Sequence, residues 1–279
     1  MAIIKYESEY FSVEDTLTCG QTFRFIKLED GKFKVFAKDK CAIAYNDGED
    51  AYILCEDCDR DYFYNYFDLS RDYKKISDYA KNKGVKVLTD AVSVGKGIRI
   101  LNQDKTEMLF SFIVSQNNNI PRIKKIINSL CESLGSPLTF NGEVYHAFPS
   151  VSDLSQKGVD FYQSLGLGYR ASYIKATADL LSQGFSLESF SSLSTKDLKE
   201  ELKKLHGVGP KVADCVTLFG FHRGDSFPVD TWIEKLYFED FNGTLTSRDK
   251  ITDFFLEEFG EFSGYIQQYL FHYKRNIEK

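Results

Sequence analysis

The sequence contains no long hydrophobic run and no surplus of positive charge. No segment approaches the roughly 18–20 consecutive apolar residues that a membrane-spanning helix needs, which argues against a transmembrane protein. Residues 1–17 contain neither the basic stretch nor the continuous apolar stretch of a secretory signal peptide. We therefore expect no membrane partner and a location in the cytoplasm.

Cysteine is sparse, with six residues at irregular spacing, a pattern more typical of free thiols than of a disulfide framework. The single CxxC motif, Cys55 to Cys58, has no second pair at the spacing of a zinc site. The four histidines show no ligand spacing such as HExxH. We therefore expect no metal held by side chains.

The composition is that of a globular chain, with 279 residues of which 43% are apolar and 15% aromatic, enough for two domains or more. The net charge of −6 is unfavourable for binding nucleic acid, which rests largely on Lys and Arg neutralising phosphates. Basic residues nevertheless gather in short clusters, and a local field can steer a polyanion. The clusters are Arg122 with Lys124 and Lys125, Lys203 with Lys204, and Lys274 with Arg275. Solvated helix faces are an equally good interpretation of each cluster.

Two kinds of periodicity divide the chain. From Phe23 to about Leu54, short β-rich segments alternate with glycine-containing turns, which predicts an antiparallel sheet. After Asp61 the apolar residues recur at helical spacing. We therefore predict an α+β fold, with an N-terminal antiparallel β domain in residues 1–95 and a mostly helical body in residues 96–279.

The pattern over residues 198–220 predicts a helix, a tight hairpin and a second helix. The hairpin contains Gly207, Val208 and Gly209, and its glycines allow the backbone to approach a ligand closely. Pro210 suits the first position of the second helix, whose free N–H groups and positive dipole end favour a phosphate. We therefore predict that the backbone of the hairpin binds phosphate.

Lys211 and Asp230 are the candidate reactive groups of this part of the chain. Lys211 lies in the first turn of the second helix, where the dipole and any burial both favour the neutral, nucleophilic amine. Asp230 lies at the N-cap position of the next helix, where backbone donors hold its carboxylate and where it can face developing positive charge. A surface lysine and a simple helix cap are the alternative interpretations.

Further motifs follow one another along the chain in a fixed order. They are CGQTFRF at 19–25, SQNNNIPRI at 115–123, GLGYRA at 166–171, PVD at 228–230 and GYIQQYLF at 264–271. Together with the hairpin, they resemble the successive signatures of the 8-oxoguanine DNA glycosylases of the helix-hairpin-helix superfamily. A hairpin alone would be weaker evidence, because it also occurs in ligases, polymerases and recombination proteins. The resemblance implies an antiparallel β domain, two helical subdomains and an active site in the cleft between them.

The resemblance implies a bifunctional enzyme whose partner is duplex DNA containing 8-oxoguanine opposite cytosine. Such an enzyme flips the damaged base out of the stack and attacks the anomeric carbon of its sugar with a lysine. The base is expelled, and the imine that remains permits β-elimination of the strand. Lys211 matches the nucleophile and Asp230 the stabilising carboxylate. Relatives without this lysine use water and are not lyases, so Lys211 predicts AP lyase activity as well.

The resemblance also assigns residues that receive the flipped base. 8-Oxoguanine has a donor at a ring nitrogen that is an acceptor in guanine, and the carbonyl of Gly20 matches the group that detects this donor. Cys215 lies on one helical face with Lys211, where a thiolate paired with the ammonium would favour the oxidised base. A buried structural cysteine is the alternative. The other matches, which could also be ordinary packing residues, are Phe219 and Pro228 in the pocket wall, Gln267 at the Watson–Crick edge and Phe271 stacked on the base.

A second set of matches concerns the gap that the flipped base leaves. Asn117 matches the plug and Tyr169 the intercalating wedge, a task that suits an aromatic ring. Arg122 and Arg170 match the two arginines that bracket the orphaned base, and cytosine is the preferred partner if both point inward. Asn119, the last of three asparagines, is expected to cap a helix.

Two positions depart from the family. Trp232 stands where the animal enzymes carry a histidine that contacts phosphate, which puts that contact in doubt. Gln116 replaces a small residue beside the asparagine triplet, which bears on how strictly the opposite base is read. Endonuclease III relatives carry four cysteines near the C-terminus for an iron–sulfur cluster, but no cysteine follows Cys215 here. We therefore expect no cofactor, although a structural ion at the hairpin carbonyls stays an option.

Two other functions stay open at this level. A glycosylase of the same fold could act on a different damaged purine, but Gly20, Cys215 and Gln267 argue against it. A noncatalytic module could use the hairpin only to hold phosphate at damaged DNA, but Lys211 and Asp230 argue against that function.

Overall fold

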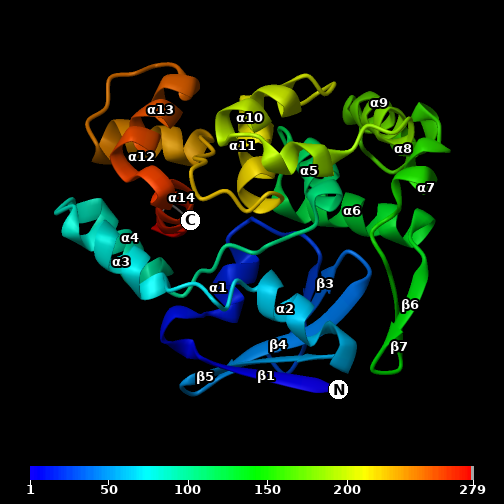
Figure 1. Cartoon of the computed structure of the whole chain (residues 1–279), viewed down its shortest axis with the longest axis horizontal. Helices are drawn as coiled ribbons and strands as arrows, with labels where there is room; N and C mark the ends of the chain where they lie inside the picture. Colours follow the sequence, from blue (N-terminus) through cyan, green and yellow to red (C-terminus); the bar gives the residue numbers. More distant parts are fainter. Residues whose placement is uncertain (278–279) are drawn as a thin grey trace.

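The short alternating segments at the N-terminus form a five-stranded antiparallel sheet in the computed structural model, which describes residues 1–277 (Figure 1). The strands are β1 (Ala2–Glu7), β2 (Phe25–Lys27), β3 (Phe33–Ala37), β4 (Lys40–Asp47) and β5 (Asp50–Cys55). Their order in the sheet is β1-β5-β4-β3-β2. In β5 every second side chain is buried, which is the pattern of a strand with one face on a core. The predicted antiparallel sheet is therefore confirmed.

Two strand segments lie outside the predicted region. One is β1, which pairs with β5 and in which only Ile4 is buried, so its apolar pattern is weak. The other is a hairpin of β6 (Pro137–Phe140) and β7 (Glu143–His146) within the helical body. The hairpin is mostly exposed, so it also lacks a clear alternation.

The change from strands to helices near Asp61 is confirmed, because the helix α2 begins at Arg60. The helices before the β6–β7 hairpin are α1 (Val13–Thr18), α2 (Arg60–Tyr66), α3 (Tyr73–Asn82), α4 (Lys86–Gly95), α5 (Lys105–Ser115) and α6 (Ile120–Leu134). Those after it are α7 (Val151–Ser155), α8 (Val159–Ser164), α9 (Arg170–Ser182), α10 (Thr195–Lys203), α11 (Pro210–Phe219), α12 (Thr231–Asp240), α13 (Arg248–Phe259) and α14 (Ser263–Ile277).

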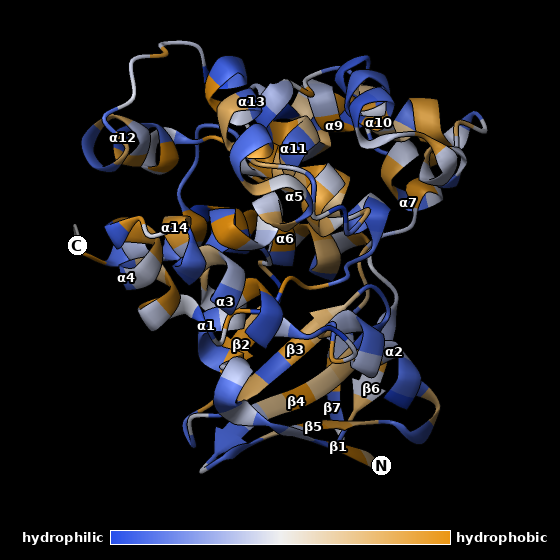
Figure 2. Ribbon diagram, turned by 60° about the vertical axis from the view of Figure 1, so that its left-hand side comes forward, coloured by the Kyte–Doolittle hydropathy of each residue, from blue (hydrophilic) through white to orange (hydrophobic). Residues whose placement is uncertain are grey.

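The C-terminal helix packs against helices from the first half of the chain. α14 lies beside α3 and α4 (Figure 1), and the rings of Tyr73 and Tyr265 meet edge to face at 5.7 Å. Figure 2 shows apolar residues concentrated on α5, α11 and α14 at the centre of the helical body. These three helices therefore form the frame on which a site between the subdomains can be built.

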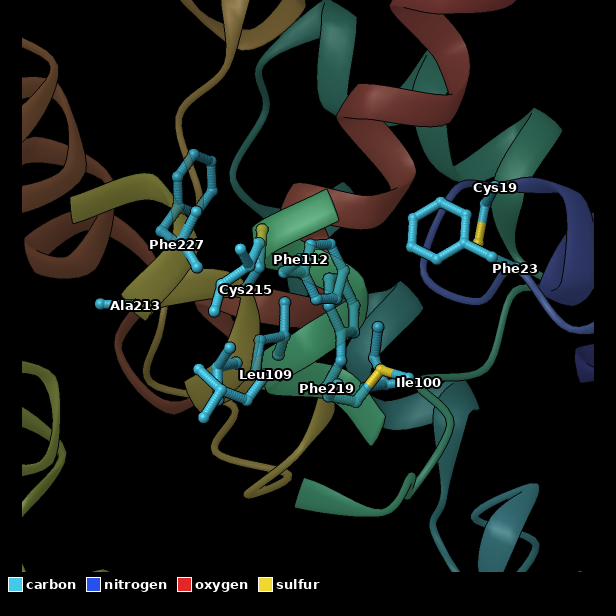
Figure 3. Packing of buried hydrophobic residues seen from close by; sticks show 14 of the residues in the cluster. Cys19, Phe23, Ile100, Leu109, Phe112, Ala213, Cys215, Phe219 and Phe227 are labelled. Carbon is cyan, nitrogen blue, oxygen red and sulfur yellow. The ribbon is translucent and has the colours of Figure 1, made fainter. Parts of the chain in front are cut away.

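Two hydrophobic cores hold the molecule together. The smaller one lies under the sheet and includes Phe11 and Leu17, while the larger one fills the helical body. Cys19 and Phe23 come from the N-terminal region but belong to the larger core (Figure 3). The loop that contains the first motif is therefore inserted into the helical body. Within residues 1–277, no helix combines the length and the apolarity that crossing a membrane requires.

Candidate active site

The predicted helix-hairpin-helix is formed by α10, the turn at 206–209 and α11. Gly207 has a φ of +81°, and a Cβ at this position would lie 2.3 Å from the ring of Tyr173, so only glycine fits. Pro210 is the first residue of α11, as expected. The carbonyl of Gly207 accepts a hydrogen bond from Nε2 of Gln116 at 2.8 Å. The hairpin is thus tied to the loop before α6.

One cavity gathers all of the residues predicted for catalysis and base recognition. They are Gly20, Lys211, Cys215, Phe219, Pro228, Asp230, Gln267 and Phe271. Phe112 of α5 and Gln268 of α14 also line this cavity, which we call the base cavity. The sequence analysis missed these two residues: Phe112 lies in a largely apolar helix without a motif, and Gln268 lies inside a matched motif whose other positions carried the signal.

The base cavity is small in this structure. Its volume is about 40 Å³, which is room for a few water molecules and not for a purine. Phe271 is the half-buried residue of its wall on α14, and its ring packs against Gly20, where an added Cβ would lie 3.4 Å from it. Entry of a base therefore requires side chains of the wall to move.

Lys211 and Cys215 meet on one face of α11, as the spacing predicts. The Nζ of Lys211 lies 5.4 Å from the centre of the Phe112 ring. Burial raises the pKa of Cys215 to about 11, although the nearby charge of Lys211 acts in the opposite direction. Burial in an apolar cluster disfavours the charged form, so this environment favours a neutral Cys215 over the predicted thiolate (Figure 3). Cys215 is a neutral thiol at neutral pH.

Asp230 is the N-cap of α12, as predicted. Its Oδ1 accepts hydrogen bonds from the backbone N–H groups of Trp232 and Ile233, both at 3.0 Å. Burial raises the pKa of the Asp230 carboxyl above its ordinary value, while the two N–H donors and the charge of Lys211 act to lower it. The carboxylate is therefore fixed in direction and lies within the electrostatic reach of Lys211.

Two buried side chains hold the loop that presents Gly20, and the sequence analysis assigned no role to either. Gln21 is fully buried, and its Nε2 donates to the carbonyls of Thr16 and Arg99 at 2.9 and 2.7 Å. Arg24 donates to Glu107 of α5 at 3.2 Å, and the two side chains are 3% and 5% exposed. Both residues belong to the CGQTFRF motif, so this motif contains the support of the loop as well as Gly20.

Gln267 and Phe219 take fixed positions in the wall of the base cavity. The Nε2 of Gln267 donates to the carbonyl of Pro228 at 3.1 Å, which links α14 to the loop before α12. The ring of Phe219 stacks on that of Phe112, with centroids 5.5 Å apart (Figure 3). Stacked aromatic rings therefore line the cavity on its α5 and α11 side, and the amides of Gln267 and Gln268 contribute polar groups on its α14 side.

The residues predicted to fill the gap in the duplex lie together on a second part of the surface. Asn117 is exposed with a φ of +45°, and Tyr169 is 51% exposed at the start of α9. The predicted cap is confirmed, since Asn119 accepts from the N–H of Arg122 at 3.0 Å. The contact between Gln116 and Gly207 connects this part of the surface to the hairpin.

The two predicted arginines bind backbone carbonyls of the neighbouring loops. Arg122 donates to Gly166 at 3.0 Å, and Arg170 donates to Gln116 through Nε at 2.7 Å and to Asn117 through Nη2 at 2.8 Å. Arg170 is 3% exposed and also donates to Leu167, so most of its donors are used. Arg170 therefore orders the loop of Asn117, whereas Arg122 keeps several donors for a base.

Trp232, the single tryptophan of the chain, is half-buried at the second position of α12. It thus stands beside Asp230, on the helix whose N-terminus meets the base cavity. A larger cavity of about 620 Å³ lies between α10, α11 and α13, but none of the predicted site residues lines it. Within residues 1–277, no three His, Cys, Asp or Glu residues are placed to hold a metal ion.

An antiparallel sheet joined to a helix-hairpin-helix body, with a lysine and an aspartate in one apolar cavity, defines a helix-hairpin-helix enzyme of the kind that flips bases. The family model of the HhH-GPD superfamily base excision DNA repair proteins matches residues 110–261, and that of the 8-oxoguanine DNA glycosylase N-terminal domain matches residues 3–109. The chain belongs to the HhH-GPD superfamily and carries the N-terminal domain of its 8-oxoguanine DNA glycosylases.

Individual relatives are similar along most of the chain. The 8-oxoguanine glycosylase/lyase of Clostridium acetobutylicum, solved with double-stranded DNA containing cytosine opposite 8-oxoG, is 39% identical, with a TM-score of 0.93 over 100% of this chain and 99% of that chain. A "Probable N-glycosylase/DNA lyase" of Methanothermobacter thermautotrophicus is 32% identical over 75% of this chain and 72% of the relative. The N-glycosylase/DNA lyase of Saccharomyces cerevisiae is 40% identical over 52% of this chain and 42% of the relative.

A more distant structure shares the fold alone. The 3-methyladenine DNA glycosylase of Archaeoglobus fulgidus is 19% identical, with a TM-score of 0.80 over 99% of both chains. Its likeness therefore gives no support to a different damaged purine as the substrate of this chain.

Proposed function

We propose that this chain is a bifunctional DNA glycosylase and AP lyase that excises 8-oxoguanine opposite cytosine from duplex DNA. The observation that carries the proposal is the base cavity, in which residues from the loop at Gly20, α11, the loop before α12, and α14 converge. A nucleophile, a carboxylate and an apolar wall for a planar base lie together there. An enzyme with this substrate works where the chromosome lies, so we place it in the cytoplasm, on the nucleoid if the host is prokaryotic.

The proposed chemistry begins at Lys211. Its Nζ lone pair forms a bond to C1′ of the sugar while the bond from C1′ to the base breaks, and the electron pair leaves with the base, which takes up a proton. The carboxylate of Asp230 stabilises the positive charge that develops on the sugar. Opening of the sugar ring then gives an imine between C1′ and Nζ. Loss of a proton from C2′ breaks the C3′–O bond and cleaves the strand.

The proposed contacts with DNA use three parts of the surface. The backbone of Gly207, Val208 and Gly209 binds a phosphate of the damaged strand, since the N-terminus of α11 lies directly behind it. Tyr169 inserts into the stack and Asn117 fills the gap left by the flipped base. Arg122 reads the orphaned base with the donors that it keeps, and Arg170 holds the loop of Asn117 in place.

The test is borohydride trapping on a duplex that carries one 8-oxoguanine opposite cytosine, with an undamaged duplex as the control. Lesion-dependent covalent trapping is expected, because the imine is reduced to a stable amine. Lys211→Gln should bind the lesion duplex but lose both trapping and strand cleavage. The matched control is Lys81→Gln, an exposed lysine of α3 away from the base cavity, which should trap like the unaltered protein.

Two outcomes would overturn the assignment. Absence of trapping, with binding of the lesion duplex intact, would mean that no imine forms and would leave a monofunctional or noncatalytic protein. Trapping that persists in Lys211→Gln would mean that another amine is the nucleophile.

A further inference from the structure

One residue that lines the base cavity carries a buried polar atom without a partner. Gln268 lines this cavity from α14 and is 4% exposed. Its Nε2 donates to Oε1 of Gln267 at 3.1 Å, but its own Oε1 is buried and has no hydrogen-bond partner within residues 1–277. A buried carbonyl oxygen without a donor is unfavourable, because it has lost its hydrogen bonds to water. Such an acceptor in the wall of a substrate cavity indicates that the substrate supplies the donor.

The neighbouring amide fixes which atom of Gln268 is left over. Nε2 of Gln267 donates to the carbonyl of Pro228, so Gln267 presents its oxygen to Gln268. This oxygen accepts a hydrogen bond from Nε2 of Gln268. The atom of Gln268 that remains without a partner is therefore Oε1, which is an acceptor. A carbonyl oxygen has two lone pairs, so Oε1 of Gln267 keeps one for a ligand as well. The wall therefore offers two neighbouring acceptors to a ligand with two neighbouring donors.

A guanine-type base carries such a pair of donors on its Watson–Crick edge, the ring N1–H and the exocyclic 2-amino group. An adenine-type base has an acceptor at N1 and no 2-amino group. We propose that Gln268 is a specificity-determining residue whose Oε1 accepts a hydrogen bond from the 2-amino group of the flipped base, beside Gln267 at N1–H. The inference rests on the proposed function and names the atom of the purine that this residue recognises.

The consequence is selection against bases that lack the 2-amino group. A site with a hydrogen-bonding group for one substrate atom rejects an analogue without that atom, because the group of the protein is then left buried and unpaired. 8-Oxohypoxanthine is the matched analogue, since it keeps N1–H and the oxidised five-membered ring and lacks only the 2-amino group. The unaltered enzyme should therefore excise 8-oxoguanine about tenfold or more faster, which is the effect of one hydrogen bond.

The experiment compares both bases, each opposite cytosine, in single-turnover excision by the unaltered enzyme and by Gln268→Met, which keeps the length of the side chain without its polar atoms. The variant should excise 8-oxoguanine about tenfold or more slowly. On 8-oxohypoxanthine it should match the unaltered enzyme, because the hydrogen bond is already absent from that complex. Protein and substrate then form a double-mutant cycle in which the two losses do not add.

The matched control is Tyr269→Phe, which removes a buried polar atom from the next residue of α14 without touching the base cavity. It should leave the ratio of the two excision rates unchanged.

If Gln268→Met slowed both substrates by the same factor, Gln268 would be a structural residue and the proposal would fail. If the unaltered enzyme excised both bases equally fast, the proposal would fail without any variant, even if Gln268→Met did not fold. Neither result would affect lesion-dependent trapping by the unaltered enzyme, which tests the proposed function separately.

Discussion

Asp230 has two tasks that draw on different properties of one side chain. As the N-cap of α12 it needs an oxygen that accepts from Trp232 and Ile233, and as a stabiliser of the sugar cation it needs a negative charge. Asparagine keeps the oxygen and loses the charge. The two tasks can therefore be separated by a single substitution.

Asp230→Asn should lower the single-turnover excision rate about 100-fold or more, since removing one preorganised electrostatic group from an active site typically has this effect. The free energy of unfolding should change by less than about 1 kcal/mol, because asparagine is as good an N-cap as aspartate. Rates and chemical denaturation are the measurements, and Asp230→Ala is the comparison that loses both tasks. A large loss of stability in Asp230→Asn would show that the charge serves the fold.

The pH dependence of the rate should reveal the same carboxyl. Burial raises the pKa of Asp230 above the ordinary value of 3.8, and the ionised form is the active one. The excision rate should therefore rise with pH along a limb whose midpoint lies above 3.8, and this limb should be absent from Asp230→Asn. A rate that is flat across the acid range in the unaltered enzyme would contradict the role of the charge.

The raised pKa of Asp230 also makes the free energy of unfolding depend on pH. A carboxyl with a raised pKa in the folded state stabilises the fold at low pH, and this contribution is lost as pH rises through the folded pKa. The stability of Asp230→Asn relative to the unaltered protein should therefore increase as pH rises through that region. Denaturation at several pH values provides the measurement.

For single residues, the sequence predicted which side chains meet, but not their protonation or hydrogen bonding. The spacing of Lys211 and Cys215 places them on one helical face whatever surrounds them. The neutral thiol of Cys215 depends on burial by side chains from α5 and α14, which are far away in sequence. The unpaired oxygen of Gln268 likewise depends on the direction of two amides, so neither property can be derived from spacing.

Reciprocal contacts of two arginines connect the loop before α6 with the loop before α9. Arg122 reaches from the first turn of α6 to Gly166, and Arg170 reaches from the start of α9 back to Gln116 and Asn117. Arg170 uses a fork of donors that are held in one plane, whereas Arg122 makes a single contact. The positions of Asn117 and Tyr169 relative to each other therefore depend mainly on Arg170.

Arg170→Lys should weaken binding of the lesion duplex by about tenfold, because lysine keeps the charge but cannot form the planar fork. Arg60→Lys is the matched control, since it makes the same change of side chain at an exposed position of α2 outside the proposed DNA contacts. Binding titrations measure both variants at one salt concentration. Binding by Arg170→Lys as tight as that of the unaltered protein would mean that Arg170 acts through its charge and not by ordering the loop.

The elements themselves were predictable where their apolar pattern is strong, as in α6 and the helices of the hairpin. The strand β1 was missed because only one of its residues is buried, and its pairing with β5 arises from tertiary contact. The motif around Arg170 indicated an arginine at a DNA surface. It could not indicate that carbonyls of a different loop occupy the donors of this arginine.

For the whole molecule, the ion pair of Arg24 and Glu107 connects the sheet region to the helical body. Arg24 also donates to the carbonyls of Lys38 and His146, so one buried guanidinium joins three segments that are distant in sequence. Glu107 lies on α5, the helix that places Phe112 in the base cavity. The relative position of the loop at Gly20 and α5 therefore depends on this pair.

Arg24→Ala should lower the free energy of unfolding by about 3–5 kcal/mol, because it leaves Glu107 buried without its cation. The control is Lys27→Ala, which breaks the exposed pair with Glu14 and should cost about 0–1 kcal/mol. Denaturant titration of both variants is the measurement. If both variants lost a similar free energy of unfolding, the buried pair at Arg24 would stabilise the fold no more than the exposed pair at Lys27.

The single tryptophan gives the molecule an optical probe in a useful place. Trp232 is half-buried two residues after Asp230, and its backbone N–H bonds to that carboxylate. Emission excited to the red of tyrosine absorption therefore has one source in the entire chain, at the N-terminus of the helix that meets the base cavity. Entry of a base, departure of a product and closure of the cavity can each be followed in time by the colour and intensity of this emission, in a protein without any added dye.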